Sequence, residues 1–398
     1  MLDVFFSYDF FPKIGGAHLW LYKVAYHWQR PCIYLTQKMP EMSFEAESFD
    51  AERHGSIKDI VRLPFGISSW GIDKNFLKNT ILLHKFLSTL RKREKARRVI
   101  VHAVKAIPEG ANLLWLKFLL RNNLCLITYA HGEEFLVAQS SKELGWLAKK
   151  SLVTSELIIA NSFSTARLVE NFLGHNCKKR IKIKVVHLGV DFELYQLPHD
   201  ERRSYRKAWG FPEEAVILIT VARMEPRKNQ EAVIKAVAEL HKEGIPVAYV
   251  IAGSGEKEKE LKQLVEELGL DVWVRFLGRI SEEEKIKSFC AADIHVMPSI
   301  QIGPMIEGFG IVFMEAGAAG IPSIAGNIGG QPEAVIHGKT GFVIDGNNLE
   351  ELVSALKRLA TDKELRQKMG KQARVWAKEH DWKNISQEIF NEVSSLCL

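Results

Sequence analysis

Residues 297–316 read MPSIQIGPMIEGFGIVFMEA, a short apolar run, a loop rich in Gly and Pro, and then a helix-forming stretch that begins near Gly310. A strand that continues through such a loop into a helix is one unit of an open α/β sheet, and ligands bind at the carboxyl ends of its strands. The free N–H groups and partial positive charge of a helix N-terminus favour anions. The stretch therefore predicts a site for phosphate, or for developing negative charge, in an α/β domain.

Two glycines and two glutamates carry the chemistry of this stretch. Gly308 and Gly310 allow the backbone to approach a ligand closely. Glu307 lies in the loop, whereas Glu315 lies two turns into the helix. Two carboxylates beside an anion site are costly unless hydroxyl groups donate hydrogen bonds to them, and a sugar and a ribose supply such hydroxyls. The alternative is that Glu307 caps the helix and Glu315 faces solvent.

A second loop contains two cations, Arg223 and Lys228, five residues apart and just after the apolar run 216–221. Arg offers a planar fork of donors and Lys a compact charge, a combination that suits a diphosphate. We interpret the pair as phosphate-binding. The alternative is a pair of ordinary surface cations.

Short apolar, β-branched runs alternate with amphipathic segments of helix length along the whole chain, a pattern typical of parallel sheets covered by helices. Each half of the chain begins with an expected strand, then a loop, then a helix. The loop contains Gly15 and Gly16 in the first half and spans 223–228 in the second. We therefore expect two copies of one doubly wound plan. The expected strands are 4–7, 32–36, 99–103, 125–129, 157–160, 183–187, 216–221, 247–252, 272–277, 294–297, 322–325 and 342–344.

The length of 398 residues is too great for one ordinary core and favours two domains. The polar segment 191–212 lacks a strand-like run, and we expect it to link them. The first domain is predicted over 1–193 and the second over 194–376. The remaining segment, 377–398, should form a helix that packs back on the first domain.

Composition excludes several classes of protein. No apolar run reaches the ~18 residues that span a bilayer, and residues 1–5 lack the basic start of a signal peptide, so we expect them to form a first strand. The five cysteines are odd in number and lack metal-ligand spacing, which fits a reduced cytoplasm. No Asp-x-Asp or His/Asp cluster indicates a cation site. We expect no metal and no cofactor.

The net charge is uneven. Residues 1–190 contain 28 Lys and Arg against 16 Asp and Glu, and the remainder contains 26 against 32. The basic residues concentrate in 85–98 and in 178–184. These segments are either solvated faces or a surface for anionic lipid or an anionic acceptor. Nucleic acid is not expected as a partner, because aromatic side chains do not interleave with the charges.

With these residues in view, the chain resembles glycosyltransferase family 4, the retaining "glycosyl transferases group 1" with the GT-B fold. The hallmark of that family is two glutamates separated by seven residues, and Glu307 and Glu315 match it. The fold implied is α/β, with two Rossmann-like domains that face a central cleft. Further similar motifs are AR…KN at 222–229, AGSGE at 252–256, FLGR at 276–279, GG…PEA at 329–334, GKTGF at 338–342, GG at 15–16, HGEE at 131–134 and HLGVD at 187–191.

The resemblance implies roles for individual residues of the second domain. Arg223 and Lys228 would bind the diphosphate, Glu315 the ribose hydroxyls, and Glu307 the hydroxyls of the donor sugar. The backbone near Arg279 would meet the base. The implied donor-binding set of the second domain is Arg223, Lys228, Arg279, Ile280, Glu307, Phe309, Gly310, Ile311 and Glu315.

In the first domain, the resemblance places Gly16 against the phosphate or the acceptor and His131 against the sugar. The implied catalytic set is Glu307, His131, Arg223 and Lys228. A lone histidine such as His131 is otherwise most often structural. Two positions depart from the family pattern. His18 stands where a Glu is usual, which affects acceptor contacts, and Leu188 stands where an Asn is usual.

The reaction implied is metal-independent transfer of a hexose with retention, by same-face attack in which the departing phosphate takes the acceptor's proton. UDP-glucose or another UDP-hexose is the expected donor, and GDP-mannose is the alternative. The acceptor would be a glycan or a lipid-linked glycan of envelope or exopolysaccharide synthesis, at an anionic membrane surface. Other readings are an epimerase, a phosphorylase or a non-catalytic nucleotide-sugar-binding protein.

Overall fold

The computed structural model describes residues 1–11, 15–38, 44–66, 72–120, 123–174, 181–303 and 305–396. Three residues of the predicted basic segment 178–184, namely 178–180, lie outside these ranges, as do Cys177 and Cys397. The chain divides into two compact units. The first consists of Met1–Leu188 together with Trp382–Leu398, and the second consists of Gly189–Asp381.

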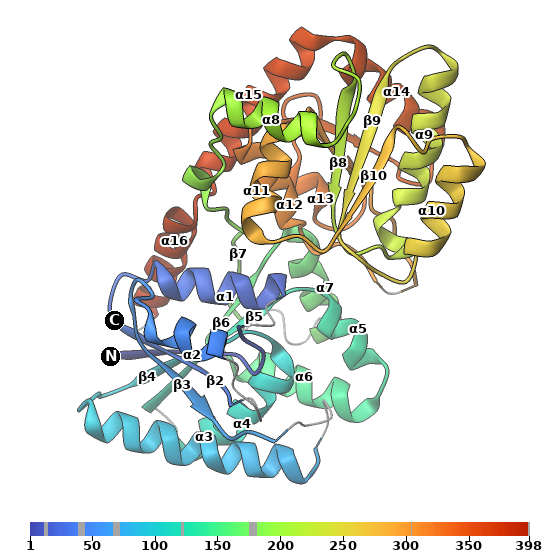
Figure 1. The fold of residues 1–398 in the computed structure, drawn as a ribbon. Coiled ribbons are helices and arrows are strands. Elements are labelled where there is room, and N and C mark those ends of the chain that lie inside the picture. Colours follow the sequence, from blue (N-terminus) through green and yellow to red (C-terminus); the bar gives the residue numbers. More distant parts are fainter. Residues whose placement is uncertain are drawn as a thin grey trace. The chain divides into compact units, whose positions relative to one another are not determined.

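The first unit is built on a parallel seven-stranded sheet, in the order β3-β2-β1-β4-β5-β6-β7 (Figure 1). One strand, β3, was not expected, because three of the seven residues in Ile57–Leu63 are charged; it pairs with β2 at the edge of the sheet. The strands are β1 (Leu2–Phe6), β2 (Cys32–Gln37), β3 (Ile57–Leu63), β4 (Val99–Ala103), β5 (Leu124–Ala130), β6 (Leu157–Ala160) and β7 (Ile183–Val185).

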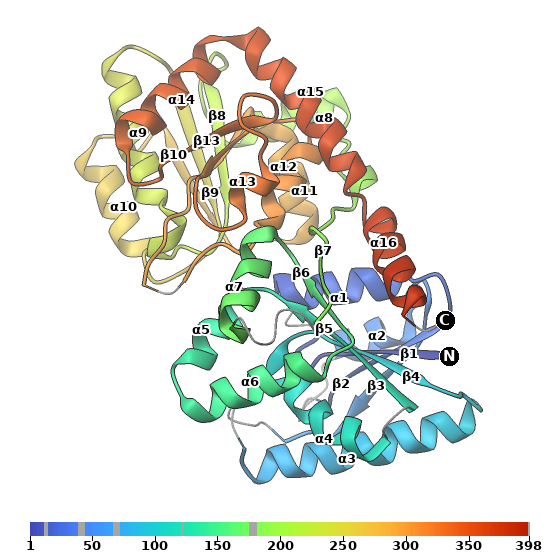
Figure 2. The ribbon, with the colours of Figure 1, turned by 180° about the vertical axis from the view of Figure 1, so that it is seen from behind.

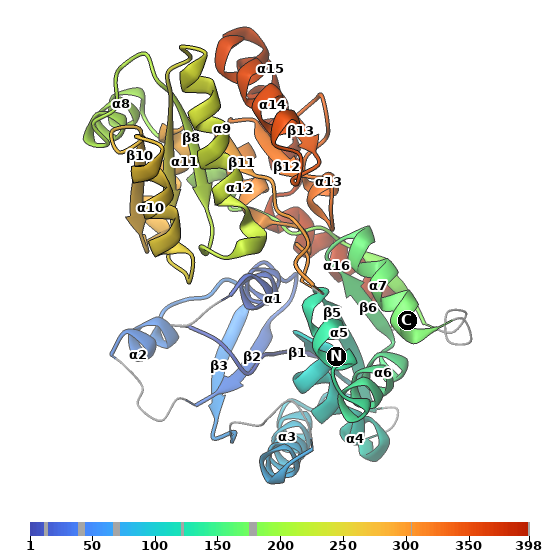
Figure 3. The same cartoon turned by 90° about the vertical axis from the view of Figure 1, so that its right-hand side faces the viewer.

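Helices cover both faces of this sheet, with α1 on one face and α3, α4 and α6 on the other (Figures 1 and 3). Val4 and Phe6 of β1 pack towards α3 and α4, whereas Phe5 between them contacts Trp28. This alternation follows from the two-residue period of a strand. The helices are α1 (Gly16–Tyr26), α2 (Phe44–Ala51), α3 (Lys74–Arg93), η1 (Ala106–Gly110), α4 (Ala111–Leu120), α5 (Glu133–Gln139), α6 (Lys142–Thr154) and α7 (Phe163–Leu173).

The last helix, α16 (Trp382–Ser395), completes the first unit by packing on α1 (Figure 2). Ser386 Oγ donates a hydrogen bond to the Val24 carbonyl oxygen at 2.8 Å, and Phe390 contacts the ring of Trp28. The expected boundary at 377 falls inside the preceding helix, which continues to Glu379, so the segment that packs back begins at Trp382. No helix among the described residues is both long and apolar enough to span a bilayer.

The second unit has a parallel six-stranded sheet in the order β10-β9-β8-β11-β12-β13. Its strands are β8 (Val216–Val221), β9 (Val247–Ala252), β10 (Val274–Gly278), β11 (Ile294–Met297), β12 (Ser323–Gly326) and β13 (Gly341–Ile344). Its helices are η3 (Phe192–Leu194), α8 (His199–Ala208), η4 (Pro226–Lys228), α9 (Gln230–Lys242), α10 (Glu258–Glu267), α11 (Glu282–Ala291), α12 (Ile311–Ala318), α13 (Gln331–Ala334), α14 (Leu349–Thr361) and α15 (Lys363–Glu379).

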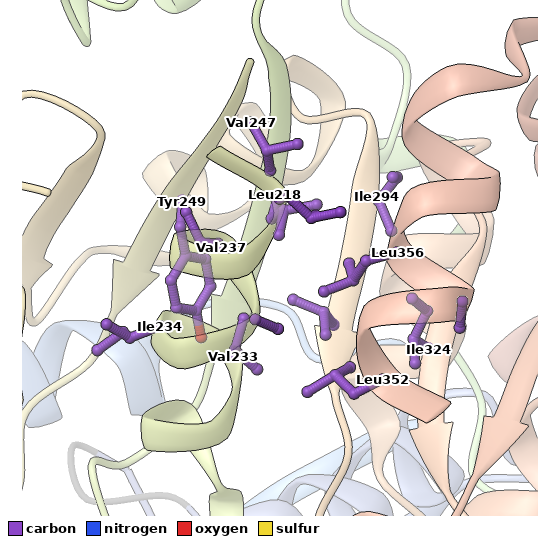
Figure 4. Close-up of a cluster of buried hydrophobic side chains, with 14 of the residues drawn as sticks. Leu218, Val233, Ile234, Val237, Val247, Tyr249, Ile294, Ile324, Leu352 and Leu356 are labelled. Carbon is purple, nitrogen blue, oxygen red and sulfur yellow. The ribbon is translucent and has the colours of Figure 1, made fainter. Parts of the chain in front are cut away.

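One core of the second unit lies between its sheet and the helices α9 and α14 (Figure 4). Val233 and Val237 of α9 lie one turn apart, as do Leu352 and Leu356 of α14, so each helix turns one apolar stripe to the strands. Full burial of such a side chain contributes about 1.5–3 kcal/mol. Together the two sheets agree with the expected class, two doubly wound α/β domains.

The segment 191–212 differs from the linker expected there, because it contains α8 and belongs to the second unit. Arg206 of α8 donates to Asp293 Oδ2 at 2.8 Å and to the Ala291 carbonyl oxygen at 2.8 Å. The chain leaves the first unit between Leu188 and Gly189. Just beyond that crossing, the N–H of Val190 donates to the carbonyl oxygen of His380, 3.0 Å away, near the place where the chain returns.

Candidate functional site

Glycine contacts shape the loops that follow β8, β9 and β10. Gly253 has φ +132°, and a Cβ on it would overlap the Ala222 carbonyl oxygen. The N–H of Met224 donates to the Ser254 carbonyl oxygen at 3.1 Å, and Arg279 Nε donates to Ser254 Oγ at 3.0 Å. The AGSGE motif thus supports the loop that contains Arg223 and also contacts Arg279.

A chain of alternating charges begins at Arg223. Its Nη1 lies 2.6 Å from Glu225 Oε1, and Glu225 Oε2 accepts from Arg227 Nε at 3.1 Å. Arg227 Nη1 in turn donates to Glu307 Oε2 at 3.0 Å, and the Lys228 ammonium contacts the same oxygen. Three cations and two carboxylates leave this network with one net positive charge.

Members of the network differ in exposure. The side chain of Arg223 is 71% exposed, whereas those of Arg227, Lys228 and Glu307 are only 10–13% exposed. Burial opposes ionisation of Glu307, but Lys228 and Arg227 together hold the pKa of its carboxyl below the usual value. Glu307 is therefore an ionised carboxylate clamped by two cations, and Arg223 is the member that points into solvent.

Two glycines, Gly329 and Gly330, pack against the backbone of the loop around Glu307. The N–H of Gly330 donates to the Glu307 carbonyl oxygen at 3.0 Å, and a Cβ on Gly330 would overlap the Gly308 carbonyl oxygen. Gly310 caps α12 with φ +88°, in the left-handed region, and no side chain caps that helix. The GG motif at 329–330 thus sets the path of the loop, and the first N–H groups of α12 receive no side-chain oxygen.

Glu315 has a separate partner. Its side chain is 5% exposed, and its Oε1 accepts from Lys285 Nζ of α11 at 2.7 Å. Its Oε2 is buried without a hydrogen-bond partner among the described residues. Such a buried acceptor is costly unless something donates to it, so this oxygen is available to a ligand hydroxyl.

Comparison with known proteins identifies the second unit. Residues 201–376, which contain the whole charge network and Glu315, match the model of the family "Glycosyl transferases group 1". Over these residues, the chain is similar to the group 1 glycosyl transferases.

Two curated relatives are similar to about half of this chain. The GDP-mannose-dependent alpha-(1-6)-phosphatidylinositol monomannoside mannosyltransferase of Mycobacterium tuberculosis is 34% identical over 190 residues, which is 47% of this chain and 49% of that protein. The D-inositol 3-phosphate glycosyltransferase of Streptomyces avermitilis is 33% identical over 240 residues, 58% of this chain and 50% of that protein. The chain thus spans about half the length of the curated relatives it matches.

The fold of the chain has solved counterparts over its whole length. The crystal structure of Anabaena Alr3699/HepE in complex with UDP superimposes with a TM-score of 0.79, at 21% identity, over 99% of this chain and all of that one. Sucrose-phosphate synthase from Thermosynechococcus elongatus superimposes with a TM-score of 0.75 at 19% identity, over 99% of this chain and 98% of that one. These similarities confirm the predicted GT-B fold class.

In the first unit, the predicted residue His131 follows β5. Its ring Nε2 lies 2.8 Å from the Val104 carbonyl oxygen, and its ring packs edge-on against Trp20 of α1. Burial and the charge of Lys105 lower the pKa of His131 to about 3, so the ring is neutral near pH 7. These contacts fit the structural alternative as well as a ligand contact, and its catalytic role stays a prediction.

Gly16 is exposed at the first position of α1, and a Cβ added to it would meet no atom within 4 Å. Among the described residues, nothing close to Gly16 therefore requires glycine at this position. His18, which stands in place of the usual Glu, lies two residues further along α1. Its Nδ1 is 2.6 Å from Ser7 Oγ, and its Nε2 is 3.6 Å from Asp9 Oδ2.

The structure joins Arg223, Lys228 and Glu307 into one network, while Arg279 and Glu315 have partners of their own. Phe309, Gly310 and Ile311 form the entry into α12, and Ile280 follows Arg279 directly. The described residues contain no group of three His, Cys, Asp or Glu side chains that would hold a metal ion.

Three residues of the site were missed at the level of the sequence: Arg227, Glu225 and Lys285. The prediction rested on the spacing of Arg223 and Lys228. Arg227 directly precedes Lys228 in the sequence, so a third cation in the same loop could have been included. Lys285 lies 30 residues before Glu315, and no local pattern connects them.

Proposed function

We propose that this chain transfers a hexose from a nucleoside diphosphate sugar to a glycan or lipid-linked acceptor. The observation that carries the proposal is the charge network, in which Arg227 and Lys228 clamp Glu307 directly before the uncapped N-terminus of α12. The network lies in the segment that matches the family. It presents positive charge and a fixed carboxylate side by side, as a diphosphate joined to a sugar requires.

In the proposed donor complex, Arg223 swings from Glu225 onto the diphosphate, because its side chain is largely exposed and has the shortest path into solvent. Lys228 and the first N–H groups of α12 add positive charge at the same place. Glu307, held in position by Arg227, accepts hydrogen bonds from sugar hydroxyls, and the buried Oε2 of Glu315 accepts one from the ribose.

For the transfer step, we propose attack by the acceptor hydroxyl on the same face of the sugar from which the phosphate departs. The bond from the anomeric carbon to the phosphate oxygen breaks, the bond to the acceptor oxygen forms, and the leaving phosphate takes the acceptor's proton. The charge that develops on the diphosphate would fall on Arg223, Lys228 and the N–H groups of α12. This route retains the anomeric configuration and needs no metal.

Two donors are candidates. UDP-glucose or another UDP-hexose is the donor expected from the sequence. GDP-mannose is favoured by the name of the mycobacterial relative, which is 34% identical over 190 residues. The UDP complex of Anabaena Alr3699/HepE, at 21% identity, supports the fold and does not choose between the bases.

The experiment that tests the proposal combines nucleotide binding with donor turnover. Thermal unfolding is followed with UDP, GDP and ADP, since a ligand at 100 times its Kd stabilises the folded state by about 2.7 kcal/mol. Hydrolysis of UDP-hexoses and GDP-mannose is then measured with and without a chelator. We expect a shift with UDP or GDP and no effect of the chelator. The absence of any nucleotide-dependent shift would contradict the proposal, and strict dependence on Mg²⁺ would contradict its metal-free step.

A further inference from the structure

Exposed apolar side chains concentrate on three helices of the first unit. Sixteen large apolar residues of the described chain are at least a third exposed, and six of them lie on α3, α4 and α6, which together contain 43 residues. Scattered exposed apolar residues are ordinary, but a group on neighbouring helices indicates an interaction surface. The six are Leu77, Ile81, Trp115, Leu119, Trp146 and Val153, each 45–61% exposed.

The three helices form one layer. α4 packs against α3 on one side and against α6 on the other, and all three cover the same face of the sheet (Figures 1 and 3). The beginnings of α3 and α6 are also joined, because the N–H of Ile72 donates to Glu143 Oε1 at 2.6 Å. The exposed side chains of this layer therefore face away from the sheet together. We name the layer formed by α3, α4 and α6 the outer helical face.

Charges on the outer helical face are almost all positive. Its helices contain ten Lys and Arg residues and a single acid, Glu143, which is engaged at Ile72. Seven of the lysines are exposed, and the described structure shows no ion pair for them: Lys74, Lys78, Lys85, Lys92, Lys142, Lys149 and Lys150. Leu77 and Ile81 lie one turn apart on the same exposed stripe of α3 as Lys74, Lys78 and Lys85.

The basic segment 85–98, singled out in the sequence, is partly engaged within the protein. Glu94 lies 3.1 Å from Arg93 Nε and 3.7 Å from Lys58 Nζ, and Arg98 lies 3.3 Å from Glu156. Five of the seven unpaired lysines lie outside this segment, on the same helices as the apolar group. The outer helical face therefore combines lysines that can attract an anionic surface with apolar side chains that can be buried against it.

We infer that the outer helical face docks on an anionic lipid bilayer, with its Trp, Leu and Ile side chains in the headgroup boundary and its lysines against lipid phosphates. This inference deepens the lipid-linked acceptor of the proposed function and rests on it. Half-exposed Trp side chains suit the boundary between water and hydrocarbon, and a mixed basic and apolar helix face binds in that plane without spanning it. A second copy of the chain fits less well, because two such faces would bring many lysines together.

The test is sedimentation of the full chain with vesicles of phosphatidylcholine alone and of phosphatidylcholine with phosphatidylglycerol, at low and high salt. We expect binding to the anionic vesicles, part of which resists salt because apolar side chains are inserted. The double variant W115S/L119S should lose the salt-resistant part and bind at least ~10-fold more weakly, since apolar insertion adds to membrane affinity. The double variant K78Q/K85Q should weaken the binding that depends on salt.

The matched control is V272S/V375S, which removes two exposed apolar side chains from the second unit, 63% and 55% exposed. It should bind vesicles as the unaltered chain does. Equal binding by W115S/L119S and the unaltered chain would overturn the inference, as would absence of binding to either vesicle. Self-association that W115S/L119S abolishes would assign the face to a second copy instead.

Nucleotide binding separates this test from that of the proposed function. W115S/L119S and K78Q/K85Q lie outside the second unit, and their thermal shift with UDP or GDP should match that of the unaltered chain. If nucleotide binds but vesicles do not, the docking surface fails and the proposed transfer stands. If vesicles bind but no nucleotide does, the proposed transfer fails.

Discussion

At the proposed diphosphate site, Arg227 helps to hold the carboxylate of Glu307 in place. Glu307 alone would repel a diphosphate, but two cations clamp its Oε2, and the pKa of the carboxyl stays below its usual value. Arg223 is the least engaged cation of the network, because Glu225 holds it only at the surface. The residues thus divide into a fixed part, made of Glu307 with Arg227 and Lys228, and a movable part, made of Arg223.

Arg223→Ala is predicted to remove transfer without affecting the fold. Loss of one preorganised charged donor typically lowers kcat about 10²–10³-fold, whereas the exposed side chain contributes little to stability. The measurements are donor turnover and thermal unfolding. Arg203→Ala is the matched control, since that arginine is 69% exposed and also pairs with a single glutamate. Similar turnover in the two variants would refute the assignment of Arg223.

Arg227→Gln is predicted to shift the pH profile of donor turnover. Because the pKa of Glu307 is lowered in the folded chain, its ionised form persists at neutral pH and is lost as pH falls through that lowered pKa. Removing Arg227 raises the pKa, so the acid limb of kcat/KM should move to higher pH. Arg203→Gln serves as the control. An unmoved acid limb would show that Arg227 does not set the charge of Glu307.

At the scale of elements, strand-to-helix loops place the residues of the site. The network joins the loop after β8 to the loop after β11, and glycines at 253 and 330 let neighbouring loops approach without a side chain between them. Helix α1 differs, because its first residue, Gly16, has open space around it. The resemblance to glycosyltransferase family 4 places Gly16 against the phosphate or the acceptor, and that contact stays a prediction.

Gly16→Ala is therefore predicted to lower donor or acceptor affinity while the melting temperature is unchanged. A Cβ at this position meets no protein atom, and alanine is favourable in a helix. Gly330→Ala is the contrasting variant, since its Cβ overlaps the Gly308 carbonyl oxygen, and it should lower both stability and turnover. The measurements are thermal unfolding and the KM of each substrate. Unchanged KM values for Gly16→Ala would remove Gly16 from the site.

At the scale of the whole molecule, the chain leaves the first unit at Leu188 and returns at Trp382, so the first unit depends on both ends of the sequence. Helix α16 buries Trp382, Ile385, Ile389 and Val393 there. The burial of these side chains therefore stabilises the first unit, although the residues that precede α16 in the sequence belong to the second unit.

Ile389→Ala is predicted to destabilise the first unit by about 2–5 kcal/mol, the usual cost of truncating a fully buried Ile. Calorimetry with and without nucleotide measures this, because nucleotide should raise the transition of the second unit alone. The matched control, Gln387→Ala, alters an exposed residue of the same helix. An equal loss in the nucleotide-raised transition would mean that α16 stabilises the second unit too.

The sequence by itself determined the class of fold and most of the strands. Apolar runs such as 99–103, 157–160 and 216–221 match β4, β6 and β8 residue for residue, because a strand buried on both faces is apolar throughout. The edge strand β3 was not predicted, since an edge strand is less buried and three of its seven residues are charged. Family motifs likewise identified Glu307 and Glu315, whose spacing is local.

Only the tertiary structure decided which charges meet. Arg227 and Glu307 are 80 residues apart, and Lys285 and Glu315 are 30 apart, so neither pair leaves a periodic pattern in the sequence. The outer helical face has the same origin, because its exposed residues come from three helices that adjoin only after folding. Hydrophobic periodicity in the sequence indicates whether a residue is buried. Which charged side chains form ion pairs depends instead on how elements that are distant in the sequence pack at the ends of the parallel sheet.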